Sequence, residues 1–241
     1  MAEWFRTWFD TDYYHLLYAD RDENEARQFI DALLSFLAPE PGSTFIDIAC
    51  GKGRHALQLS QNGFQTTGVD LSDNSIQQAS QFSNDLLSFF VHDIRTPYSC
   101  GPFDYALNLF TSFGYFETMP EHYVALENIY NVLKPGGIFV FDYFNSEAIN
   151  CGIATNKSIE INGIKFDTSK SISGDHIVKS INVIDGEKSM DFEERVMALS
   201  FVEIQKMLEA IGFEMISFHG NYQLEEYHSE QPRVIIIAKK N

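Results

Sequence analysis

The sequence predicts an α/β protein with a mostly parallel sheet and helices on both faces. Two observations predict this class. Short apolar segments alternate with segments whose apolar residues recur at helical spacing, which is typical of βαβ units. The chain has 241 residues, of which 44% are hydrophobic, and this is enough to bury one large core. We therefore expect a single domain over residues 1–241.

The first half of the chain carries clear start and stop signals for its elements. Pro39 ends the first amphipathic helix of the alternating pattern, Asn62-Gly63 ends the next helix, and Ser72 has the side-chain oxygen of an N-cap. In chain order we expect helix 25–37, strand 44–49, helix 54–61, strand 65–69, helix 72–83, strand 88–91 and strand 105–109.

The second half continues the same alternation after one interruption. Lys134-Pro135-Gly136-Gly137 is predicted to be a turn between a helix and a strand, and Gly212 is the stop signal of the last helix. In chain order we expect helix 120–133, strand 138–143, helix 200–211, strand 214–218 and strand 233–238.

The interruption lies at residues 155–197, directly after the fifth strand. Its apolar residues alternate with polar ones, and Asn162-Gly163, Ser173-Gly174-Asp175 and Asp185-Gly186 divide it in the manner of antiparallel hairpins. Ligands of open α/β sheets bind outside the carboxyl ends of the strands. We therefore expect an inserted antiparallel β lid, the alternative being structural decoration. Residues 1–38 are expected to supply N-terminal cover helices.

Composition and charge exclude several functions. The formal net charge of −17 repels phosphate backbones and anionic lipids, so we expect neither a nucleic-acid nor a membrane partner. No apolar run is long enough for a membrane span, and the N-terminus lacks the order of a signal peptide. The three cysteines form no zinc or disulfide pattern. These features predict a cytoplasmic protein without a metal site, either monomeric or a homodimer.

A glycine turn connects the first predicted strand to the following helix. Gly51 and Gly53 allow a sharp bend and a close approach of the backbone to a ligand, and the helix that begins near Arg54 offers unpaired N–H groups. Asp70 ends the second strand 17 residues after Gly53, where a carboxylate can accept the hydroxyls of a ribose. This pattern predicts a nucleotide-type cofactor.

Two cofactors fit the pattern, a nicotinamide dinucleotide and S-adenosylmethionine (SAM). Asp47 favours SAM, because a dinucleotide places its pyrophosphate over the glycine turn, whereas SAM carries a cationic amino group and a sulfonium. The alternative for Asp47 is a carboxylate that only caps local backbone amides.

Five motifs in this order resemble those of class I SAM-dependent methyltransferases, over roughly residues 40 to 145. They are Asp47 to Gly53, Gly68 to Leu71, His92-Asp93-Ile94, Phe103 to Asn108, and Leu133 to Gly137. The resemblance implies a Rossmann-like seven-stranded sheet with an antiparallel last strand. The glycine turn and residues Asn108 to Tyr115 are similar to the small-molecule branch, which includes sugar N-methyltransferases and glycine N-methyltransferase-like enzymes.

The resemblance also implies the cofactor residues. The methionine part would be held by Asp47, Ala49, Gly51 and Gly53; the ribose by Asp70, with Leu71 against the adenine; the adenine amine by Asp93 and Ile94; and the sulfonium would be lined by Asn108 and Leu109. The product would be S-adenosyl-L-homocysteine.

The acceptor side carries weaker signals. Tyr115, in the loop after the fourth strand, and Tyr14, in the aromatic N-terminal segment, are the candidate catalytic residues. Tyr18, Arg195 and Tyr222 are candidate substrate-binding residues. The alternatives are core packing for the aromatic residues and local ion pairs for the arginine. Two further arginines are weaker candidates. Arg233 would bind an acidic group of the substrate, and Arg21 would bind the SAM carboxylate, although Arg21 fits a solvated surface position equally well.

The sequence thus predicts an enzyme that transfers a methyl group from SAM to a nitrogen or oxygen atom of a small molecule. Three rival functions stay open: a non-catalytic SAM-binding protein, a protein methyltransferase and, with less support, a nicotinamide-dependent dehydrogenase.

Overall fold

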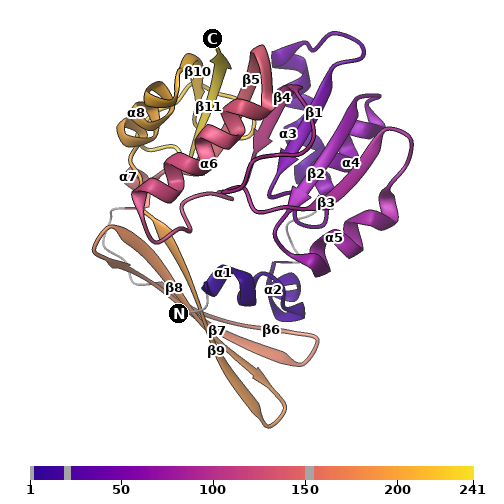
Figure 1. Ribbon diagram of the computed structural model, residues 1–241. Coiled ribbons are helices and arrows are strands. Elements are labelled where there is room, and N and C mark those ends of the chain that lie inside the picture. Colours follow the sequence, from indigo (N-terminus) through magenta and orange to yellow (C-terminus); the bar gives the residue numbers. More distant parts are fainter. Residues whose placement is uncertain (1–2, 19–22, 150–154) are drawn as a thin grey trace.

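The computed structural model describes residues 3–18, 23–149 and 155–241. Its larger sheet has seven strands in the order β10-β11-β5-β4-β1-β2-β3 (Figure 1). All neighbouring pairs are parallel except those of β11, which runs antiparallel to β5 and to β10. The strands are β1 (Thr44–Ile48), β2 (Gln65–Asp70), β3 (Leu87–Val91), β4 (Phe103–Asn108), β5 (Leu133–Phe144), β10 (Phe213–His219) and β11 (Arg233–Lys240).

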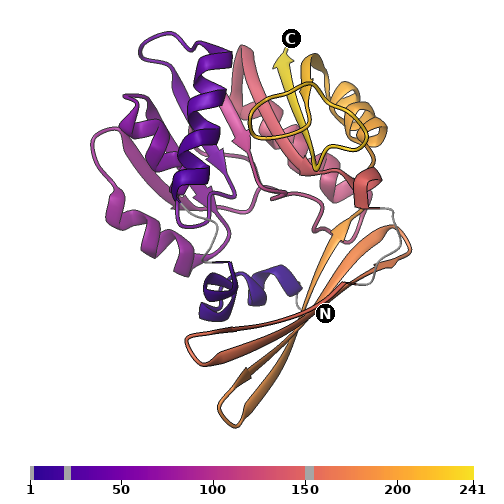
Figure 2. The same cartoon turned by 180° about the vertical axis from the view of Figure 1, so that it is seen from behind.

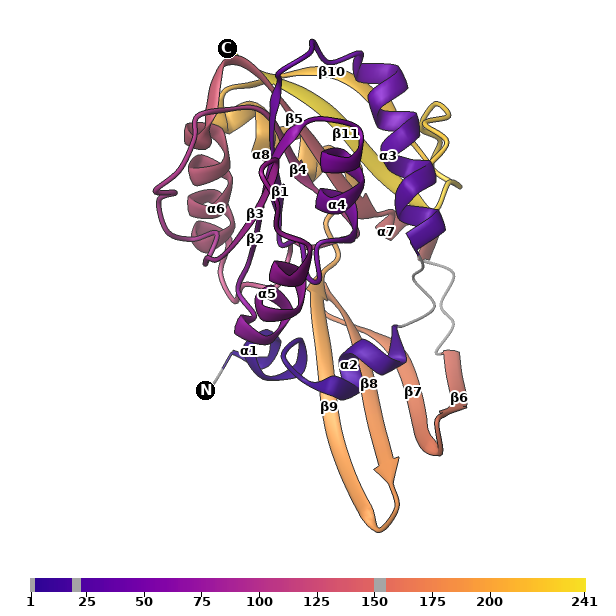
Figure 3. The same ribbon diagram turned by 90° about the vertical axis from the view of Figure 1, so that its right-hand side faces the viewer.

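Helices cover both faces of this sheet, as Figure 3 shows edge-on. On one face α6 (Met119–Val132) and α8 (Phe201–Ile211) bury residues such as Ile129 and Leu208 against the strands. On the other face lie α3 (Glu23–Leu37) and α4 (Arg54–Gln61), with α5 (Asp73–Ala79) beside α4. This arrangement confirms the predicted fold class, including the antiparallel last strand.

Alternation along β1 decides which side chains meet which helices. Ile46 and Ile48 point into the core under α6, whereas Phe45 packs with α3 and α4 on the opposite face. Asp47 shares the parity of Phe45 because side chains alternate along a strand, and its carboxylate reaches the backbone of α4. A carboxylate is therefore buried at the carboxyl end of the sheet.

A second sheet follows β5 and the short helix α7 (Ser146–Ile149). It is antiparallel, in the order β6-β7-β8-β9, and it confirms the predicted antiparallel insertion. Its strands are β6 (Thr155–Ile161), β7 (Ile164–Ser173), β8 (His176–Asp185) and β9 (Lys188–Met197). Figures 1 and 2 show this sheet beyond the carboxyl ends of the parallel strands.

Two N-terminal helices, α1 (Trp4–Trp8) and α2 (Asp12–Leu17), lie between the two sheets (Figure 3). Trp8 is buried against Phe192 of β9, with ring centroids 4.6 Å apart, and its indole N–H donates to Glu194 at 2.8 Å. Tyr13 donates to Asp185 of β8 at 2.9 Å. The inserted sheet is thus held to the N-terminal helices by a small core of its own.

Two segments differ in local structure from the prediction. The helix expected over 72–83 ends at Ala79, and a 3-10 turn follows at Ser80–Phe82. The turn expected over 134–137 is incorporated into β5, where the register against β4 shifts between Phe103 and Tyr105. Glycine at 136 supplies the left-handed backbone, with φ +78°, that this irregular strand requires. In the described ranges, no helix is long and apolar enough to span a membrane.

Candidate cofactor and active site

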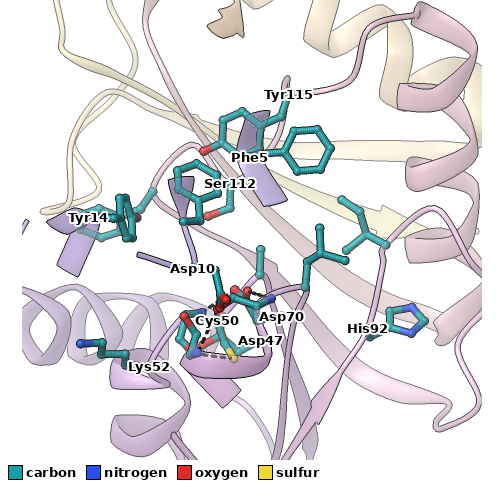
Figure 4. Close-up of a pocket in the computed structure, with 18 of the residues that line it drawn as sticks. Phe5, Asp10, Tyr14, Asp47, Cys50, Lys52, Asp70, His92, Ser112 and Tyr115 are labelled. Carbon is teal, nitrogen blue, oxygen red and sulfur yellow. Dashed lines mark hydrogen bonds between the residues drawn. The ribbon is translucent and has the colours of Figure 1, made fainter. Parts of the chain in front are cut away.

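A cavity of about 620 Å³ lies at the carboxyl ends of β1, β2 and β4. Its floor is formed by strand ends and by the glycine turn, including Asp47, Asp70 and Leu109. Its cover comes from the N-terminal segment, which contributes Phe5 and Tyr14 (Figure 4). Phe9, which follows α1, also lines the cavity. A concave pocket at this position is where open α/β sheets bind ligands. Most of the residues predicted to form the site lie around it.

The glycine turn has the backbone that its sequence requires. Ala49, Gly51 and Gly53 all have positive φ, between +55° and +79°. A Cβ on Gly51 would meet nothing within 4 Å, so the backbone is open to the cavity there. A Cβ on Gly53 would lie 2.5 Å from the Phe89 ring. Gly53 therefore does not line the cavity. Its lack of a side chain instead allows α4 to pack closely on β3 beneath the glycine turn.

Two buried carboxyl groups form the polar floor of the cavity. Asp47 is 1% exposed, its carboxylate accepts a hydrogen bond from the Ala56 N–H at 3.2 Å, and burial raises its pKa to about 7. Asp70 accepts from the N–H groups of Gly51 at 2.8 Å and Ser72 at 2.9 Å, and burial also raises its pKa. Two acids in a poorly solvated pocket favour a cationic ligand, because a nearby positive charge stabilises their ionised forms.

Asp93 lies at the other end of the cavity, where Leu71 and Ile94 also line the wall. Its carboxylate is already ion-paired, with Arg95 at 2.7 Å and with Arg6 of α1 at 2.8 Å. The guanidinium of Arg95 also contacts Glu3, just before α1. Asp93 therefore fastens the N-terminal cover to the sheet, in addition to facing the cavity.

The two candidate catalytic tyrosines reach the same cavity from different elements. Tyr115 follows β4 and Tyr14 belongs to α2, and both contact the ring of Phe9, at centroid distances of 5.3 and 4.9 Å. The Tyr115 hydroxyl donates to the backbone carbonyl of Thr111. Figure 4 shows both rings around the same pocket as Asp47 and Asp70. The structure thus brings together the aromatic residues that sequence analysis placed near the acceptor.

Four of the predicted site residues either lie outside the cavity or have their polar group bonded to another part of the protein. Asn108 is fully buried beneath the floor, where its amide donates to the carbonyls of Ile48 and Ser112. Arg195 of β9 lies 3.9 Å from Glu193, away from the cavity. Tyr222 packs behind the wall, on Phe110 at 5.0 Å. Tyr18 does line the cavity, but its hydroxyl donates to Glu194 of the inserted sheet at 2.7 Å.

The prediction that Arg195 and Tyr222 bind substrate failed to place them at the cavity because tertiary packing sets the position of their segments. Local sequence does not encode that packing. Arg233 pairs with Asp142 behind the cavity wall. Arg21 lies outside the described residues.

Two cavity residues of the N-terminal segment, Asp10 and His15, were not among the predicted site residues. Asp10 accepts from the Ser72 hydroxyl at 2.5 Å and from the Asn74 N–H at 3.2 Å, and so joins the α1–α2 turn to the start of α5. His15 lines the cavity, and burial, together with nearby Lys52, lowers its pKa to about 4. Neither residue belongs to a motif, so no signal in the sequence marked them. Within the described ranges, no three His, Cys, Asp or Glu side chains group as metal ligands.

Comparison with known proteins shows what the chain is similar to. A family model described as a methyltransferase domain matches residues 46–141, which run from β1 through the glycine turn to β5. Together with the fold, this match shows that the chain is similar to SAM-dependent methyltransferases. The predicted resemblance is therefore confirmed.

Proteins similar to most of this chain include a sequence relative and two solved structures. YqeM of Bacillus subtilis (strain 168), provisionally named a methyltransferase, is 28% identical over 215 residues, which cover 84% of this chain and 86% of YqeM. The structure of a SAM-dependent methyltransferase from Clostridium acetobutylicum ATCC 824 has a TM-score of 0.80 at 21% identity, covering 95% of this chain and 96% of that one. SAM-bound CalS10 of Micromonospora echinaspora, an amino pentose methyltransferase, has a TM-score of 0.71 at 18% identity, covering 96% and 98%. The likeness to these two structures extends over the inserted sheet.

Proposed function

We propose that this protein transfers the methyl group of SAM to a small-molecule acceptor, at nitrogen or oxygen. The observation that carries the proposal is the acidic floor of the covered cavity. Asp47 and Asp70 lie there beside an open glycine turn, in a pocket roofed by aromatic side chains. A cation with a ribose fits this combination, since one acid can face positive charge and the other can accept from hydroxyl groups.

The residues around the cavity agree with the chemistry of SAM. Asp47, Ala49 and Gly51 would hold the methionine part with its ammonium group, and Asp70 would accept from the ribose hydroxyls. Leu71, Ile94 and Leu109 offer apolar surface in the cavity to the adenine and the sulfonium. Gly53 and Asn108 would support this surface from beneath. Arg6 and Arg95 already donate to the Asp93 carboxylate, and its remaining lone pairs would accept a hydrogen bond from the adenine amine.

The cover over the cavity favours a small acceptor. Helices α1 and α2 close the site between the two sheets, so a residue on the surface of a folded protein would have to displace them (Figure 3). The amino pentose acceptor in the name of CalS10 supports the same class of substrate. A protein acceptor would need a detached cover, and this is the second candidate function.

Catalysis by this chain would consist of alignment and exclusion of water. When bound, SAM supplies a methyl group on a positively charged leaving group. Tyr14, Tyr115 and Phe9 would hold the acceptor in line with it behind the closed cover. A hydroxyl acceptor also needs a base, and the imidazole of His15, with a pKa of about 4, is a weak one. This supports an amine that arrives as its free base.

A transfer assay with methyl-labelled SAM tests the proposal. The purified protein is incubated with the labelled cofactor and with panels of amines, amino sugars and hydroxy acids, and in parallel with denatured and native cell protein. We expect label in the small-molecule fraction, with amines as the best acceptors. Label found only in the protein fraction would replace the small-molecule acceptor with a protein one.

Tyr115→Phe should lower methyl transfer to the best acceptor of that panel by about 2- to 10-fold, the value of one hydrogen bond. SAM affinity should stay the same, because the Tyr115 hydroxyl lies on the acceptor side of the cavity. Tyr130→Phe is the matched control, since the Tyr130 hydroxyl donates to the backbone of Asn241 far from the site. Unchanged turnover in Tyr115→Phe would remove this hydroxyl from the chemistry.

A further inference from the structure

A buried ion pair lies directly behind the wall of the cavity. Asp142 of β5 is fully buried, and Arg233, the first residue of β11, donates to its carboxylate from Nε at 2.8 Å. The guanidinium is largely covered, with 16% of the side chain exposed. Neither residue lines the cavity. The function proposed above therefore leaves this pair without a role.

The ion pair holds the turn that follows β4. The Asp142 carboxylate accepts from the Phe110 N–H at 2.7 Å, and the Asp142 carbonyl accepts from the Thr111 N–H at 3.0 Å. The second arm of Arg233 donates to the Thr111 hydroxyl at 3.1 Å, and this hydroxyl also accepts from the Phe144 N–H at 3.0 Å. Both backbone N–H groups of the turn are thus fixed by β5.

This turn has a backbone that requires such support. Phe110 and Thr111 have φ values of +60° and +61°, in the left-handed region that residues with a side chain rarely adopt. For a β-branched residue such as threonine, this conformation is a marked outlier. Strained backbone persists where surrounding contacts over-determine it, and such strain gathers at functional sites.

The turn carries part of the cavity wall and the anchor of Tyr115. The ring of Phe110 lines the cavity, with the Arg54 guanidinium 4.1 Å from its centroid and Tyr222 stacked at 5.0 Å. The carbonyl of Thr111 accepts the hydroxyl of Tyr115. A change in the Phe110–Thr111 backbone would therefore move both the aromatic wall and the anchor of Tyr115.

We propose that Asp142 and Arg233 are positioning residues, which hold the Phe110–Thr111 turn in its strained form so that Phe110 and Tyr115 face the acceptor. That these side chains face a methyl acceptor rests on the proposed function. That the ion pair holds the turn in its strained form does not. A stabilising role alone is a weaker explanation, because a buried ion pair gains little over an apolar pair of the same size. A substrate-binding role for Arg233 is disfavoured, because its Nε and Nη2 are engaged behind the wall and the residue does not line the cavity.

The two tryptophans of the chain provide a direct readout. The ring of Trp4 packs edge-on against Tyr115 at 5.4 Å, whereas Trp8 packs on Phe192 of the inserted sheet at 4.6 Å. Protein labelled with 5-fluorotryptophan gives two ¹⁹F resonances, which Trp4→Phe and Trp8→Phe assign. Trp4 reports on the loop that the ion pair would hold, and Trp8 is an internal control in the same molecule.

In Arg233→Met we expect the Trp4 resonance to shift or broaden by more than its linewidth while the Trp8 resonance and SAM affinity stay unchanged. Arg233→Lys keeps the charge but lacks the second arm, so it should give a smaller change of the same kind. The exposed residue Arg27 offers the matched control, Arg27→Met, in which both resonances should keep their positions.

An unmoved Trp4 resonance in folded Arg233→Met would overturn the proposal. If that variant does not fold, an unmoved Trp4 resonance in Arg233→Lys would overturn it equally, as would an equal response of Trp4 and Trp8. Titration of the parent protein with SAM distinguishes failure of this proposal from failure of the proposed function. If the parent protein does not bind SAM, the proposed function is wrong, but the Trp4 resonance still shows whether the ion pair holds the turn.

Discussion

Replacing Asp70 with alanine should weaken SAM binding by about 1.5–3 kcal/mol, roughly 10- to 150-fold in Kd. In the proposed complex the carboxylate accepts charge-assisted hydrogen bonds from the ribose. It also accepts from the N–H groups of Gly51 and Ser72, so its removal leaves these donors of the glycine turn unsatisfied. Isothermal titration of the variant with SAM measures the loss.

The matched control for this experiment is Asp85→Ala, which removes an exposed carboxylate before β3. It should bind SAM as tightly as the parent. Asp70→Asn should fall between the two, because an amide oxygen can accept from only part of the network and carries no charge. If Asp70→Ala kept the affinity of the parent, the ribose would not lie at the end of β2.

SAM affinity should fall by about tenfold for each pH unit below 7. Burial raises the pKa of Asp47 to about 7, so this carboxyl group holds a proton in the free protein at lower pH. A cation bound beside it stabilises the carboxylate and lowers its pKa in the complex. Binding below pH 7 must therefore release this proton, whereas above about pH 7.5 the carboxylate is already ionised and the affinity levels off.

Among the groups around Asp47, Arg54 stays charged, and burial keeps His55 and Cys50 neutral by lowering the pKa of the imidazole and raising that of the thiol. Asp70 is a second buried acid whose pKa burial also raises, so a variant of Asp47 is needed to separate the two carboxyl groups. Titrations at pH 5.5–7 in two buffers of different ionisation enthalpy measure the released proton. Asp47→Asn should bind weakly and lose the part of this dependence that Asp47 supplies, and any dependence left would belong to Asp70. A constant affinity between pH 5.5 and 7.5 would place the cation away from Asp47.

Most of the fold could be predicted because its signals are local. The helix over Arg54–Gln61 has the predicted bounds, since glycine precedes it and Asn62-Gly63 follows it. The strands of the large sheet are apolar runs that lie within three residues of their predicted starts, apart from the strand that incorporates the 134–137 turn. The glycine turn and the acids at the ends of β1 and β2 were predictable for the same reason, because a motif fixes their neighbours in sequence.

The remainder of the site depends on contacts between distant segments. Asp142 and Arg233 are 91 positions apart, and only the antiparallel pairing of β5 with β11 brings them together. Among the aromatic residues of the N-terminus, Trp8 faces the inserted sheet and Phe9 faces the cavity. The sequence did not predict which of these residues would face which side. Asp10 reaches Ser72 across 62 residues. Such pairings are set by how the elements pack, so one sequence did not reveal them.

Titration of the purified protein with SAM, S-adenosylhomocysteine and NADH in parallel tests the central claim most directly. The account predicts that both adenosyl ligands bind with Kd values in the micromolar range and that NADH gives no heat of binding. Binding of NADH alone would contradict it, because the acidic floor would then hold a pyrophosphate, and the assignment of Asp47 and Asp70 to SAM would have to be abandoned.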